Sequence, residues 1–117
     1  MSTTDIVLEL SNIGRELDKL SRDIDQLDRQ CVSAWSAHRR AYAETFLASQ
    51  GKGPQEDRKQ AAVLAVEDQR LAAESADQIL RAARERIRVL RDRLEIGRSL
   101  GAAMRSQFAA EPVGQTT

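Results

Sequence analysis

Apolar residues recur at alternating steps of four and three along the N-terminal half of the chain, and this spacing constrains the fold more than any other feature. The series is Ile6, Leu10, Ile13, Leu17, Leu20, Ile24, Leu27 and Cys31. Such a repeat places its members at the a and d positions of a heptad, on one face of a helix that packs against another helix. After one extra four-residue step, which relaxes the supercoil, the stripe continues as Trp35, His38, Tyr42 and Phe46. The pattern predicts a helix over about residues 5–48.

A second periodic segment follows a turn that contains glycine and proline. The stretch SQGKGPQ, residues 49–55, ends the first segment, and Pro54 suits the first position of a new helix. Glu56 and Asp57 then lie in the first turn, where carboxylates interact favourably with the helix dipole. The inward positions expected over residues 54–108 are Ala65, Gln69, Ala72, Ala76, Leu80 or Ile79, Ala83, Ile87, Leu90, Leu94, Gly97, Gly101, Met104 and Phe108. Small residues near the turn should face the rings of the first helix.

These segments predict a single all-α domain over residues 1–117, a long antiparallel helical hairpin of the coiled-coil type. Its parts are a helix over about 5–48, a turn over 49–53, a helix over about 54–108 and a frayed tail over 109–117. A lone hairpin buries only one stripe per helix and is marginally stable. We therefore expect a homo-oligomer, most simply a homodimeric helical bundle.

Composition narrows the class of protein. Charged residues make up 31% of the 117 residues with a formal net charge of zero, and aromatic residues only 3%. A single cysteine allows no internal disulfide and suits a reducing compartment. No apolar run reaches the length of a membrane span, and no signal peptide is recognisable. We expect a soluble, cytoplasmic, non-enzymatic protein with no cofactor, no metal, no membrane association and no small-molecule substrate.

Oppositely charged residues flank the apolar stripes. A turn centred near residue 51 places Glu16 opposite Arg86 and Glu9 opposite Arg93, all at g positions, which face each other in an antiparallel pair. These four residues are predicted to form interhelical ion pairs that set the register.

A second set of arginines occupies the other edge of the second helix. Arg84, Arg91 and Arg98 fall at e positions, and Arg81 and Arg88 extend the same side. The residues expected opposite the e positions include only one acid, so the row is available for acids of a second hairpin or for a polyanion. Arginine binds phosphate bidentately, which makes nucleic acid a candidate partner. The neutral chain and the lack of interleaved aromatic residues favour subunit pairing or solvation.

Three further features are candidate sites. Cys31 and His38 lie seven residues apart on one helix face, but two ligands are too few for a structural zinc site, so both are assigned to packing. The segment GKGP, residues 51–54, lacks the full phosphate-loop motif and indicates a turn. Residues 98–108 should overhang the first helix if Asp5 lies near residue 97. Whether they continue the second helix is open, and their apolar members Leu100, Met104 and Phe108 are the predicted oligomer or partner interface.

Two stretches carry a family resemblance. ERIRVLRDRLEIGRSLGAAMRSQF, residues 85–108, and GKGPQEDRKQAA, residues 51–62, resemble small coiled-coil proteins encoded by actinobacteriophages. The resemblance implies an accessory factor of phage DNA recombination or replication that acts through a protein partner in the host cytoplasm. It supplies no functional residues. Direct, sequence-nonspecific nucleic-acid binding through the arginine row is the alternative.

Overall fold

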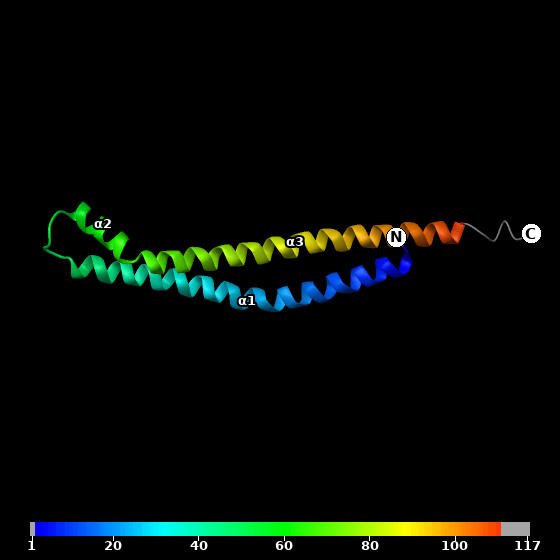
Figure 1. Ribbon diagram of the computed structural model, residues 1–117, viewed down its shortest axis with the longest axis horizontal. Coiled ribbons are helices and arrows are strands. Elements are labelled where there is room, and N and C mark those ends of the chain that lie inside the picture. The colour runs from blue at the N-terminus through cyan, green and yellow to red at the C-terminus, as the bar shows by residue number, and fades with distance from the viewer. Residues whose placement is uncertain (1, 111–117) are drawn as a thin grey trace, which may run out of the picture. The chain divides into compact units, whose positions relative to one another are not determined.

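The computed structural model describes residues 2–110, and within them it contains helices and turns but no strand. The helices are α1 (Thr3–Ala48), α2 (Gln55–Ala65) and α3 (Glu67–Ala110), as labelled in Figure 1. The predicted all-α helical hairpin is confirmed. Residues 98–108 continue α3, and most of the expected tail, residues 111–117, lies outside the described part. In that part no helix is both long and apolar enough to cross a membrane.

The described residues form two compact units. Among the described residues, unit 1 combines residues 2–22 with residues 84–110, and unit 2 comprises residues 23–83. Unit 1 pairs the first part of α1 with the last part of α3, which lie side by side in Figure 1. Unit 2 contains the remainder of α1, the turn, α2 and the start of α3.

Helix α1 begins with a reciprocal pair of hydrogen bonds. The backbone N–H of Asp5 donates to Ser2 Oγ, and the backbone N–H of Ser2 donates to Asp5 Oδ2, both at 3.1 Å. This arrangement is a capping box, which satisfies N–H groups that have no partner inside the helix. The hydrogen bond from the Ser2 backbone lowers the pKa of Asp5. The cap fixes the helix start two residues before the predicted one.

The connection between α1 and α2 depends on two glycines. Gly51 and Gly53 have φ values of 81° and 110°, which side-chain-bearing residues rarely adopt. Pro54 precedes α2 as its N-cap residue, with φ −62° and ψ 149°, so it lies one position before the first helical residue. Glu56 and Asp57 occupy the first turn, as predicted.

Arg58 of α2 fastens the connection to the end of α1. Its Nε donates to Ser49 Oγ and its Nη2 donates to the carbonyl oxygen of Phe46, each at 3.1 Å. The guanidinium carbon also lies 4.4 Å from the centre of the Phe46 ring, a cation–π contact. One side chain thus holds the first turn of α2 against the last turns of α1.

The expected second helix is divided at Val66, whose φ of −108° and ψ of 20° separate α2 from α3. Backbone hydrogen bonds continue across this residue, because Val66 N–H donates to Ala62 and Arg70 N–H donates to Val66. Val66 is therefore a local distortion in the hydrogen-bonded chain.

The buried positions near Val66 differ from the prediction. Ala65, Gln69 and Ala72 are exposed, whereas Ala62, Val66 and Ala73 are buried. Val66, Ala73 and Leu80 are spaced seven residues apart, so they lie on the same face of the helix. The predicted series did not keep this spacing. Leu80 is the buried alternative and Ile79 is exposed.

The stripe predicted for α1 is confirmed. Every member from Ile6 to Phe46 is buried or half-buried, and Ile6, Ile13 and Cys31 are the most enclosed. In unit 2, Tyr42 and Phe46 stack with ring centres 6.3 Å apart. In unit 1, Leu90 is the largest fully buried side chain, with 1% of its surface exposed.

Candidate interaction surface

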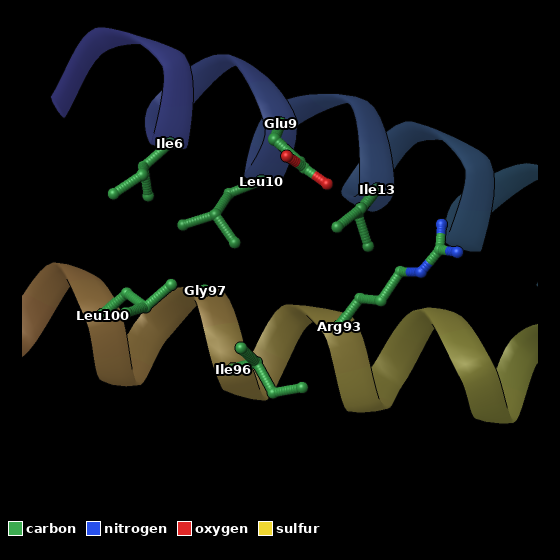
Figure 2. A pocket seen from close by; sticks show the side chains of 8 residues that line it. All are labelled: Ile6, Glu9, Leu10, Ile13, Arg93, Ile96, Gly97 and Leu100. Carbon is green, nitrogen blue, oxygen red and sulfur yellow. The ribbon is translucent and has the colours of Figure 1, made fainter. Parts of the chain in front are cut away.

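An apolar groove runs between the two helices of unit 1, and we call it groove A. It encloses about 210 Å³. Its walls are Ile6, Glu9, Leu10 and Ile13 from α1, with Arg93, Ile96, Gly97 and Leu100 from α3 (Figure 2). Ile96 and Leu100 are 61% and 47% exposed, although both are large aliphatic side chains. Groove A therefore presents apolar surface that this chain leaves uncovered within its described residues.

A second groove, groove B, lies in the same unit and shares Ile6 and Leu10 with groove A. Its other lining residues are Thr3, Val7, Gly101, Met104, Arg105 and Phe108. Val7 and Phe108 are 59% and 69% exposed. Apolar surface is thus accessible along two grooves of this helix pair. Exposed apolar surface of this kind is typical of a binding interface.

The contact between Leu10 and Gly97 corrects the predicted register. The sequence placed Asp5 near residue 97, but a Cβ atom built on Gly97 would overlap Leu10 Cδ2 and lie 3.3 Å from Leu10 Cγ. Leu10 therefore lies against α3 where a glycine leaves room for it. This pairing brings α1 five residues farther along α3 than predicted, because a large side chain fits over the glycine.

Part of the predicted overhang remains, because the C-terminal end of α3 continues past the start of α1 in Figure 1. Met104 and Phe108 nevertheless line groove B together with Thr3 and Val7 of α1, so their side chains are not isolated from the first helix. Leu100 lies in groove A. The three residues predicted as one interface are therefore distributed over two grooves.

One of the two predicted ion pairs is present. Arg86 donates from Nε and Nη2 to the two carboxylate oxygens of Glu16, at 2.9 and 3.2 Å. These hydrogen bonds lower the pKa of Glu16, with a smaller contribution from the charge of Arg93, and they raise the pKa of Arg86. Both side chains are almost half exposed, so the pair mainly specifies orientation.

The second predicted pair is not formed within residues 2–110. Glu9 and Arg93 both line groove A, but no hydrogen bond or ion pair joins them. Figure 2 shows the Arg93 guanidinium extended along α1 past Ile13, away from the Glu9 carboxylate. Groove A is therefore bordered by an acidic and a basic group that do not neutralise each other.

The arginine row is partly occupied by carboxylates from its own helix. Arg81 pairs with Asp77 and Arg88 pairs with Glu85, each at 2.5 Å. The hydrogen bonds from Arg88 lower the pKa of Glu85. Arg91 and Arg98 are exposed and form no ion pair within the described residues, while Arg84 does have an interaction partner. The row is thus less uniformly available to a polyanion than its sequence suggests.

Cys31 and His38 have the surroundings of packing residues. Cys31 is 6% exposed, and its thiol lies 3.7 Å from Asp77 Oδ1. Burial raises the pKa of this thiol, and the nearby Asp77 charge adds to the effect, so the reactive thiolate is disfavoured. The His38 ring makes an edge contact with Trp35 at 5.8 Å. No group of three or more potential metal ligands occurs in the described part of the chain.

Sequence reasoning missed Val7 and Ile96 as exposed residues of the two grooves. Val7 and Ile96 are apolar residues outside the a and d positions, and this departure from the heptad pattern was the signal that could have identified them.

The chain matches no known protein family, and no curated protein or solved structure is significantly similar to it. The function is therefore inferred from the chemistry of the two grooves.

Proposed function

We propose that this chain is a non-enzymatic helical interaction module that self-associates through the grooves of unit 1. The observation that carries the proposal is the exposure of Val7, Ile96, Leu100 and Phe108 around grooves A and B. Covering a large aliphatic or aromatic side chain contributes about 1.5–3 kcal/mol, far more than a typical exposed ion pair. Apolar contact should therefore decide assembly.

The resemblance to coiled-coil proteins of actinobacteriophages extends the proposal. It favours a cytoplasmic accessory factor in phage DNA recombination or replication, in which the assembled module holds a protein partner. The protein–protein role is consistent with grooves lined mainly by apolar side chains.

Two matched variants test the proposal by sedimentation velocity. Leu100→Ala with Phe108→Ala shortens one exposed side chain in each groove and should weaken self-association while circular dichroism remains helical. Replacement of Arg84, Arg91 and Arg98 by Gln should affect assembly less. Loss of assembly in the arginine variant, with assembly retained in the apolar variant, would refute the proposed interface.

Direct nucleic-acid binding is the second candidate function. It is favoured by the exposure of Arg91 and Arg98, which have no carboxylate partner within residues 2–110. A titration with single- and double-stranded DNA at several salt concentrations tests it, because each phosphate contact makes affinity fall more steeply with salt. Binding with a steep salt dependence that disappears in the arginine variant would support it.

A further inference from the structure

Groove A carries information about orientation as well as apolar surface. Its α1 wall contributes Glu9, and its α3 wall contributes Arg93, with aliphatic side chains between them (Figure 2). Just beyond the groove the same charge arrangement recurs, with Glu16 on α1 and Arg86 on α3. Groove A therefore has one carboxylate, from α1, and one guanidinium, from α3, which reaches toward α1 beside Ile13 in Figure 2.

The two charge pairs differ in their state. Glu16 and Arg86 bind each other through two hydrogen bonds. Glu9 and Arg93 form neither a hydrogen bond nor an ion pair with any residue among 2–110, although the Arg93 charge helps to lower the pKa of Glu16. Two opposite charges thus remain available on the rim of an uncovered apolar groove.

We propose that groove A binds groove A of a second copy of this chain, with Glu9 of each copy paired with Arg93 of the other. The inference rests on the proposed self-association and specifies its surface and orientation. An interface between identical copies related by a two-fold axis uses the same patch twice, so the patch must be complementary to itself. An apolar floor between one acid and one base meets that requirement.

Charge selects one of two ways in which the grooves can face each other. If α1 of one copy lies on α1 of the other, Glu9 approaches Glu9 and Arg93 approaches Arg93, which is repulsive. If α1 of one copy lies on α3 of the other, each acid meets an arginine. The second arrangement also covers Ile96 and Leu100 with aliphatic side chains of the opposite copy. Like charges placed together across an interface disfavour the first arrangement strongly.

Two charge reversals test the proposal in trans. Glu9→Arg places arginine opposite arginine, and Arg93→Glu places glutamate opposite glutamate, so each variant alone should associate about tenfold or more weakly than the wild type. In an equimolar mixture, the two introduced side chains meet each other across the interface, and the native Glu9 of one variant meets the native Arg93 of the other. A 1:1 heterodimer should therefore form with nearly wild-type affinity.

Mixing also distinguishes pairing between copies from pairing within one, because a pair within one chain cannot be rescued by a second chain. Glu95→Arg and Arg98→Glu, which change residues that do not line groove A, are the matched controls. Both should associate as the wild type does.

A cross-linking experiment tests the orientation without reversing charge. Glu9→Cys and Arg93→Cys, each combined with Cys31→Ala, are mixed and oxidised with a mild thiol oxidant. The proposal predicts a Glu9→Cys to Arg93→Cys heterodimer as the main disulfide-linked product. A main product that joins two Glu9→Cys chains would overturn it in favour of α1 on α1.

The combined results separate this inference from the proposed function. If the wild type associates but charge reversal has no effect, or mixing gives no rescue, the Glu9–Arg93 orientation is wrong while self-association stands. If the wild type stays monomeric over the whole concentration range, both fail. Weakened single variants with rescue in the mixture support the inference.

Discussion

Replacing Gly97 with alanine tests whether the fit of Leu10 against α3 fixes the register. Alanine is a better helix former than glycine, so each Gly→Ala change inside a helix should add about 0.5–1 kcal/mol of stability when the site has room. Gly14 of α1 has that room, because a Cβ atom there would meet nothing within 4 Å. Gly14→Ala is therefore the control that reports the helix preference alone.

Gly97 differs because its new methyl group would overlap the end of the Leu10 side chain. Leu10 has to rotate or the helices have to separate, and such overpacking costs about 1–3 kcal/mol. Gly97→Ala should consequently be about 1–3 kcal/mol less stable than Gly14→Ala. Gly101→Ala, whose Cβ would lie 3.6 Å from Arg105 Nη1, should behave like the control.

Urea denaturation followed by circular dichroism measures these free energies of unfolding. All variants should be compared at one protein concentration, since self-association stabilises the folded state by mass action. Equal stabilisation by Gly97→Ala and Gly14→Ala would refute the register and the packing of Leu10 described above.

Three further outcomes follow from individual contacts. Leu90→Ala should lower the free energy of unfolding, measured by urea denaturation, by about 2–5 kcal/mol, because Leu90 is 1% exposed. Leu64→Ala, at a residue that is 77% exposed, should stay within about 0.5 kcal/mol of the wild type. Similar losses in the two variants would contradict the assigned core. Glu16→Gln should be less stable than the wild type at pH 7, because Arg86 lowers the pKa of Glu16 in the folded state. In thermal melts this difference should disappear as the pH falls below about 4.3 and through the lowered pKa. A difference that persists in acid would show that the carboxylate charge is not the cause. Arg58→Lys keeps the charge but loses the planar guanidinium that contacts Ser49 and Phe46, so it should lower the free energy of unfolding by about 1–3 kcal/mol. Lys59→Ala, at an exposed residue, should change it little. An unchanged melting curve for Arg58→Lys would show that the contact is not stabilising.

The heptad pattern was sufficient to predict α1 and its buried face. Ile6 through Cys31 follow the repeat without interruption, and the spacing of apolar residues directly reflects helix geometry. The glycines of the turn were equally informative, since Gly51 and Gly53 adopt positive φ values. Local patterns of this kind depend on a few neighbouring residues.

The register between the helices could not be obtained in the same way. It was inferred from the centre of the turn, whereas the structure places Leu10 against Gly97 because a large side chain needs a gap in the opposite helix. The same inference nevertheless paired Glu16 with Arg86, since long side chains reach over several positions. It also paired Glu9 with Arg93, although Arg93 extends in another direction (Figure 2).

The candidate site was predicted only in outline. Leu100, Met104 and Phe108 were identified as accessible apolar residues, but their division between grooves A and B depends on how α1 lies against α3. Two of the five arginines in the predicted row pair with acids three or four residues away on α3, Arg81 with Asp77 and Arg88 with Glu85. Those acids were visible in the sequence, and their helical spacing indicated the pairing.

Sedimentation equilibrium of the wild-type chain tests the central claim, self-association through unit 1, most directly. The measurement covers a wide range of protein concentration at moderate salt, so that weak ion pairs are screened and apolar contact dominates. We predict that the average mass rises from the 13.0 kDa of one chain to about twice that value, and that Leu100→Ala with Phe108→Ala shifts the rise to higher concentration. A mass that stays at 13.0 kDa throughout would contradict the account.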